Sequence, residues 1–134
     1  SEAYSSRGHV GLDEKYFDLK LLWDNYPELL SFSQDIRSED GTFFHLHPTQ
    51  LVKHILGLTA QKGVGRFKLL YLWYDCPGDE GARHRHEVEK FLNVAKKDGI
   101  NFHAMTYQEL IAKFAKEFSQ THEKYVQYIL NRYL

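Results

Sequence analysis

The chain has 134 residues, 43% of them hydrophobic and 26% charged, a composition typical of one globular domain and not of a disordered segment. The single cysteine, Cys76, excludes an intrachain disulfide, and the longest apolar run, 69–74, is far shorter than the ~20 residues of a membrane-spanning helix, so a cytoplasmic, non-membrane protein is expected. The net charge of −1 argues against a surface uniformly coated in basic charge.

Helical spacing of apolar residues predicts a first helix over 13–23, with Asp13 and Glu14 near its start, where the helix dipole favours anions. Residues 28–46 have no clear assignment. A second helix is expected over 48–61, because Pro48 suits a first helical turn and the apolar residues that follow share one face.

The run FKLLYLWY over 67–74 lacks alternation and predicts a strand covered on both faces. A helix is expected from Asp79 or Glu80 to about Lys97, followed by a short strand over 100–105. A strand, a helix of this length and another strand form a parallel pair. The fold class is therefore predicted as α/β, with a strand-helix-strand centre flanked by helices.

The C-terminal region is predicted to be helical. Thr106 and Glu109 have the spacing of a capping box, which places the start of a helix there. The apolar residues that this helix is expected to bury are Leu110, Ile111, Phe114, Ala115 and Phe118. A final helix from about residue 121 offers Tyr125, Tyr128 and Tyr133 as an aromatic surface for a partner or a second copy of the chain.

A locally basic stretch extends over 41–74, where there is no acidic residue. Its lysines and arginine could neutralise phosphates, and Gln50 could hydrogen-bond sugars or base edges. The candidate nucleic-acid-binding residues are Gln50, Lys53, His54, Lys62 and Arg66. The competing interpretation is a solvated helix face, because charged side chains are abundant on any soluble domain.

Two other patterns are weaker candidates. The pairs His45/His47 and His84/His86 supply two ligands each, without the cluster that a recognised zinc site requires, so no metal site is predicted. Asp75 follows the first strand, where parallel sheets tend to bind ligands, but an aspartate there is also a common turn residue.

The chain resembles the later part of a PD-(D/E)XK, or restriction-endonuclease-like, nuclease domain. The segments that carry the resemblance are SEAYSS at the start, HPTQLVKHILGL, FKLLYLWYD, HEVEKFL, TYQELI and YVQYILNRYL. In that superfamily a carboxylate on one strand and a Glu-x-Lys on the next bind magnesium. The resemblance implies that these catalytic residues precede Ser1, that the intact protein hydrolyses phosphodiesters with magnesium, and that its partner is DNA.

Within this chain, the resemblance implies a site role only for part of the second helix. Some branches of the superfamily have Gln-x-x-x-Tyr there, contacting DNA and supporting the metal site, and Gln50 matches the glutamine while His54 replaces the tyrosine. The only in-order acidic match, Asp13-Glu14-Lys15, lies on an expected helix and lacks the intervening residue. Residues 1–134 are thus expected to be a single α/β domain or the C-terminal fragment of a nuclease-like domain, with no magnesium held by this chain alone. The alternative function is a non-catalytic interaction or oligomerisation module.

Overall fold

The computed structural model of the chain describes residues 11–38, 43–118 and 123–133. They form a mostly helical α/β arrangement in which a sheet of two strands is flanked by helices. The elements in chain order are the 3-10 helix η1 (Glu14–Asp18), α2 (Lys20–Trp23), α3 (Pro27–Ser38), α4 (Pro48–Lys62), β1 (Leu69–Trp73), α5 (Asp79–Lys97), β2 (Phe102–Thr106), α6 (Tyr107–Phe118) and α7 (Glu123–Tyr133). Within the described ranges, no helix is both long and apolar enough to cross a membrane.

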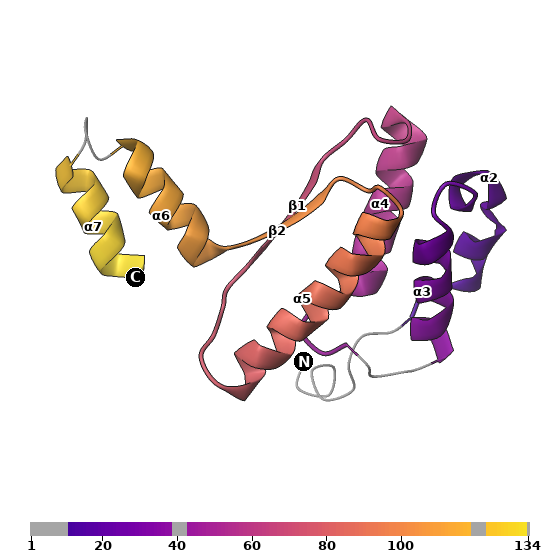
Figure 1. The fold of residues 1–134 in the computed structure, drawn as a ribbon, viewed down its shortest axis with the longest axis horizontal. Helices are drawn as coiled ribbons and strands as arrows, with labels where there is room; N and C mark the ends of the chain where they lie inside the picture. The colour runs from indigo at the N-terminus through magenta and orange to yellow at the C-terminus, as the bar shows by residue number, and fades with distance from the viewer. Residues whose placement is uncertain (1–10, 39–42, 119–122, 134) are drawn as a thin grey trace.

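The centre of the molecule is a β1-α5-β2 unit with parallel strands (Figure 1). The paired Cα positions run from Leu69 opposite Phe102 to Trp73 opposite Thr106. Parallel neighbours need a long crossover, and the 19 residues of α5 supply it. The predicted strand-helix-strand centre with parallel strands is therefore confirmed.

Phe91 of α5 lies at the centre of the core and is fully buried. Its ring makes edge-to-face contacts with Phe32 of α3, at a centroid distance of 5.6 Å, and with Phe102 of β2, at 5.0 Å. Pairs of this kind contribute about 0.5–1.5 kcal/mol beyond the burial of their area. Val52 and Ile55 of α4 belong to the same core, to which α2, α3, α4, β1, α5 and β2 all contribute.

Helix α3 occupies most of the region that the sequence left unassigned. Pro27 stands at its first position, where the missing N–H costs nothing. The exposed amides that follow are capped from far along the chain, because the Asp98 carboxylate accepts hydrogen bonds from the backbone N–H groups of Glu28 and Leu29 at 3.1 and 2.7 Å. The C-terminal end of α5 thereby fixes the start of α3.

The expected first helix is interrupted. Asp13 caps η1, with its carboxylate accepting a hydrogen bond from the Lys15 N–H at 3.1 Å, and Leu19 then adopts a non-helical conformation before α2 begins. The prediction of one continuous helix over 13–23 is wrong, because 3-10 and α-helices place residues three apart on the same side and give similar apolar spacing. Asp13 acts here as a helix cap.

The prediction that the first strand is covered on both faces is wrong for one of the two faces. Tyr71 and Trp73 contact His84 of α5, so this face of the sheet is covered. On the opposite face, Leu70 is 46% exposed, and Tyr74, which follows the strand, is 55% exposed. Successive strand residues point to opposite faces, so the apolar run lies on a sheet that α5 covers from one side only, among the residues described.

Helices α6 and α7 lie as a pair at one end of the molecule, away from α2, α3 and α4 (Figure 1). The predicted capping pair is confirmed, because the Glu109 N–H donates to the Thr106 hydroxyl at 3.0 Å. The predicted burial is wrong. Only Ala115 of α6 is buried, whereas Leu110, Phe114 and Phe118 are 37–38% exposed. Helix α6 contacts only α7 and β2 extensively, so most of its apolar side lacks a cover among the described residues.

Candidate nucleic-acid interface

Helix α4 presents a polar stripe opposite its buried side. Lys53 and His54 come three and four residues after Gln50, which places all three on one face of a helix. Gln50 and His54 are exposed and Lys53 is half-buried. The opposite side of α4 is anchored in the core by Val52 and Ile55, both fully buried. The stripe is therefore held on a rigid element.

Lys53 and His54 line a pocket of about 440 Å³, which also includes Gln61 of α4 and Leu69 of β1. The Lys53 ammonium lies 5.3 Å from the ring centroid of Tyr16, in a cation-π contact that restrains it. Gln50 does not line this pocket. The structure thus brings together two of the five predicted residues and leaves Gln50 on the same helix face, one turn earlier.

Lys62 and Arg66 lie at the end of α4 and in the connection to β1, and both are exposed. The Arg66 side chain passes over Gly63, its Cδ lying 3.4 Å from where a Cβ at that glycine would stand. Neither residue lines the pocket beside His54. Among the described residues, none of Lys53, Lys62 and Arg66 forms an ion pair with a carboxylate, so their charges are available to an anionic ligand.

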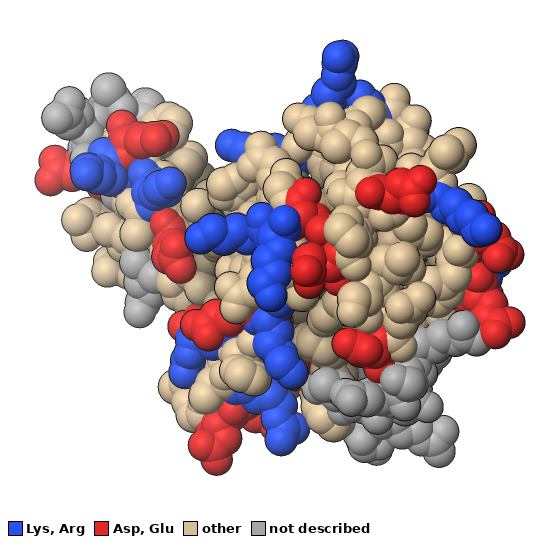
Figure 2. Space-filling view, turned by 45° about the vertical axis from the view of Figure 1, so that its right-hand side comes forward, with Lys and Arg blue, Asp and Glu red and all other residues tan. Residues whose placement is uncertain are grey.

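Basic and acidic residues are unevenly distributed along the chain, although its net charge is −1. Figure 2 shows one face of the molecule, on which Lys and Arg side chains form a vertical band with Asp and Glu side chains on both sides of it.

At the start of α4, burial and the nearby Lys53 charge lower the pKa of His47, so this imidazole is neutral at pH 7. His47 therefore adds no positive charge to the start of α4 at that pH.

A buried carboxylate fixes the loop that leads into α4. Glu87 of α5 is 3% exposed, and its Oε1 accepts hydrogen bonds from the N–H groups of His45 and Leu46, both at 2.9 Å. Its Oε2 accepts one from the Phe44 N–H at 3.0 Å. The segment Phe44 to Leu46 thus wraps its amides around a single carboxylate. Sequence reasoning missed this residue, because the pairing spans more than 40 positions.

One histidine from each of the two sequence pairs contacts a histidine of the other pair. The rings of His45 and His84 stack at a centroid distance of 5.5 Å, near the carboxyl end of β1. His45 Nε2 lies 3.1 Å from a Glu80 carboxylate oxygen, and His84 Nε2 is hydrogen-bonded to the Tyr71 hydroxyl at 2.8 Å. The ring contact therefore joins the loop before α4 to α5.

This cluster shifts the pKa values of two of its members. Burial, together with the facing His45, lowers the pKa of His84, although Glu87 and Asp75 act in the opposite direction. Burial raises the pKa of Tyr71 to about 12, with the Glu87 charge as the next cause. At pH 7 a neutral imidazole therefore faces a protonated phenol, an arrangement that suits the hydrogen bond between them.

The contacts of Asp75 hold neighbouring segments together. It forms an ion pair with Arg85, and the Gln108 amide donates to the Asp75 carbonyl at 3.1 Å. The residue therefore ties the turn after β1 to α5 and α6. Among the residues described, no group of three or more His, Cys, Asp or Glu side chains could hold a metal ion. The resemblance implies magnesium for the intact protein only, so no hydrolytic step is assigned to these residues.

Comparisons with protein-family models, with curated proteins and with solved structures find no significant match to this chain. The segment SEAYSS, which contributes to the family resemblance, lies outside the described residues. The candidate interface consists of residues of α4 and of the connection from α4 to β1.

Proposed function

We propose that this chain binds nucleic acid through α4 and the connection to β1, as the later part of a restriction-endonuclease-like protein. The observation that carries the proposal is the stripe of Gln50, Lys53 and His54 on a helix anchored in the core, followed by Lys62 and Arg66 in a stretch without acidic residues. Ammonium and guanidinium groups that lack an internal carboxylate partner are suited to phosphate contacts. Hydrolysis of phosphodiesters, in this proposal, belongs to the intact protein.

A gel-shift titration of the chain with duplex DNA tests this surface. Each of Lys53→Ala and Arg66→Ala is expected to weaken binding and to reduce the slope of log affinity against log salt by about one, because each removes one phosphate contact. The matched control is Lys20→Ala, which removes an exposed lysine on α2, outside the basic stretch. Thermal melting of the Lys53 variant checks that losing its contact with Tyr16 has not unfolded the chain.

Two outcomes would contradict the proposal. The first is the absence of any salt-sensitive shift at low ionic strength. The second is an equal effect of Lys20→Ala and Arg66→Ala, since general charge loss would then explain the result. An effect confined to the α4 region supports the proposed surface, because phosphate contacts depend on where the cations lie and not on net charge alone.

The exposed apolar side of α6 and α7 favours a second candidate function, self-association. Tyr125 and Tyr128 of α7 are 59% and 57% exposed, in addition to Leu110 and Phe114 of α6. Tyr133 belongs to the same predicted surface, but its side chain is not among those described. Helices of 11 and 12 residues are marginal without an apolar cover, so an additional packing partner would stabilise this pair.

The apolar side of α6 suits a second copy of the chain as that partner. Two copies of α6 packed antiparallel would place their exposed Leu110 and Phe114 side chains against each other, in a symmetric interface.

Light scattering over a concentration series checks the second candidate. The chain is expected to form a dimer, and the double variant Leu110→Ser/Phe114→Ser to remain monomeric, since each change removes apolar contact area. Leu21→Ser is the control, because Leu21 is 85% exposed and lies on α2. A monomer at every concentration would exclude self-association through α6 and α7.

A further inference from the structure

Helix α5 has a row of basic and amide side chains along its outer side. The row consists of Arg83, His86, Lys90, Asn93 and Lys97, which follow one another at spacings of three, four, three and four residues. At about 3.6 residues per turn, this spacing places all five on one side of the helix. All five are exposed. These residues, the α5 basic row, lie outside the basic stretch 41–74 and outside the α4 surface.

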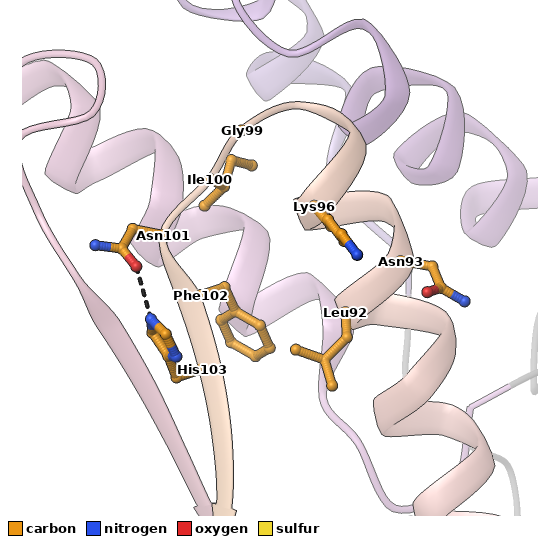
Figure 3. Close-up of a pocket in the computed structure, with 8 residues that line it drawn as sticks. All are labelled: Leu92, Asn93, Lys96, Gly99, Ile100, Asn101, Phe102 and His103. Atoms are coloured by element: carbon orange, nitrogen blue, oxygen red, sulfur yellow. Dashed lines mark hydrogen bonds between the residues drawn. The ribbon is translucent and has the colours of Figure 1, made fainter.

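The opposite side of α5 is anchored in the core. Val88 and Ala95 are buried there, and Phe91 is fully buried. Figure 3 shows Leu92 pointing from α5 toward Phe102 of β2, and Asn93 pointing away from that strand. The α5 basic row therefore faces away from the core and lies on a helix that the core holds in place.

Two of the three cations in the row lie over aromatic rings of the loop before α4. The Arg83 guanidinium carbon is 4.9 Å from the ring centroid of Phe44, and the Lys90 ammonium nitrogen is 5.7 Å from that of Phe43. The Glu87 carboxylate holds this loop by accepting a hydrogen bond from the Phe44 N–H at 3.0 Å. A cation restrained in this way loses less side-chain freedom when it binds an anion.

Positive charge dominates α5 after its first turn. From residue 81 to residue 97 the helix has five lysine or arginine residues and two glutamates. One of the two, Glu87, is buried against the loop amides, and the other, Glu89, is exposed beside the row. In the part of the chain that the structure describes, no ion pair engages Arg83, Lys90 or Lys97.

The three cations are evenly spaced along the helix axis. Arg83, Lys90 and Lys97 are seven residues apart. At 1.5 Å per residue, the row is about 21 Å long, with a cation about every 10 Å. Duplex DNA has one phosphate about every 3.4 Å along each strand, so the row extends over roughly six base pairs. His86 and Asn93 lie between the cations, and their N–H groups can donate to phosphate oxygens.

The surroundings of the row favour nucleic acid over a lipid surface. Among the described residues, none of the large apolar side chains that are exposed belongs to α5. A helix that binds a membrane surface inserts its apolar side into the lipid, and the apolar side of α5 is occupied by the core. The exposed side of the helix thus offers cations and hydrogen-bond donors, which suit a phosphate backbone.

We infer that the α5 basic row binds the phosphate backbone of a nucleic acid, as a second contact surface in addition to α4. Arg83, Lys90 and Lys97 contact phosphates, and His86 and Asn93 donate hydrogen bonds between them. This inference rests on the proposed nucleic-acid function and extends it to a second element. The row adds affinity without base preference, because phosphate contacts carry no direct sequence information.

The test is a gel-shift titration of the whole chain with duplex DNA at several salt concentrations. The triple variant Arg83→Gln/Lys90→Gln/Lys97→Gln is expected to reduce the magnitude of the slope of log affinity against log salt by about three, because three phosphate contacts are lost. Glutamine keeps a polar side chain at each position, and thermal melting checks that the variant is folded. An unchanged slope in a folded triple variant would overturn the inference.

Two control proteins separate the position of the charges from their number. The variant Lys20→Gln/Lys113→Gln/Lys124→Gln removes the same charge from exposed lysines of α2, α6 and α7, and is expected to leave the slope nearly unchanged. Glu89→Gln removes the carboxylate beside the row and is expected to strengthen binding about twofold. Equal effects of the two triple variants would overturn the inference, since net charge would then explain the loss.

The α4 and α5 substitutions report on their surfaces separately. A slope that falls in Lys53→Ala and Arg66→Ala but not in the α5 triple variant would retain the proposed function and exclude the row. The reverse result would retain the row and exclude the α4 surface, and no shift of the parent chain at low salt would exclude both. Vesicles containing phosphatidylserine are the last arm. Binding to these vesicles but not to DNA, lost in the α5 triple variant, would assign the row to a lipid surface and overturn the inference.

Discussion

Replacing Glu87 by alanine is expected to lower the free energy of unfolding by about 3 kcal/mol. The carboxylate is the acceptor for the backbone N–H groups of Phe44, His45 and Leu46, and these donors would lose their partner together. A hydrogen bond to a charged group contributes about 1.5–3 kcal/mol, and the three do not add fully because they share one carboxylate. The measurement is urea unfolding followed by circular dichroism.

Two other variants make this prediction specific. Glu89→Ala removes an exposed carboxylate from the same helix and is expected to change stability by less than about 0.5 kcal/mol. Glu87→Gln keeps the size of the side chain but replaces one acceptor oxygen by a donor, so its loss should be intermediate. Equal stability of the Glu87→Ala and Glu89→Ala variants would show that the buried carboxylate does not hold the loop.

Replacing Gly81 by alanine is expected to be equally damaging, with a loss of about 3 kcal/mol and a fall of about 10 °C in Tm. Gly81 is buried in the first turn of α5. A Cβ there would lie 1.6 Å from the Cys76 carbonyl oxygen and 2.7 Å from its carbon. Because these are backbone atoms, relief requires the turn after β1 to move away from the helix. Differential scanning calorimetry measures the change.

Gly57→Ala is the matched control for the Gly81 substitution. Gly57 lies in the interior of α4, and nothing stands within 4 Å of where its Cβ would be. Alanine has the higher helix propensity, so this change is expected to stabilise the chain by about 0.5–1 kcal/mol. Opposite signs at the two glycines would establish that the close approach to Cys76, and not loss of glycine as such, causes the damage. A Gly81→Ala protein as stable as the parent would refute the tight contact.

The sequence was most informative where structure depends on local interactions. Pro48 and the apolar spacing after it gave α4 nearly to its ends, and Thr106 with Glu109 located the start of α6, since a cap is made within one helical turn. Helix α3 was not assigned, because its amides are capped by Asp98, about 70 positions away. Pro27, at the first position of that helix, was the available local signal.

The candidate interface was predictable in part for the same reason. The position of Gln50, Lys53 and His54 on one helix face follows from spacing alone. The pocket that Lys53 and His54 share with Leu69, and the contact of Lys53 with Tyr16, depend on how α4 packs against other segments. The Glu87 carboxylate and the stacked His45 and His84 rings could not be found from any short pattern.

The strand-helix-strand centre, with its parallel order, was determined by the sequence alone, because the length of the α5 helix and the apolar runs beside it leave little other choice. Only the tertiary structure decided which faces are covered. An apolar run has the same sequence pattern whether one layer or two layers pack against it. In this structure Leu70 and Phe114 remain 46% and 37% exposed. Whether a face is covered depends on where distant elements lie, and the periodicity of one segment does not specify the positions of those elements.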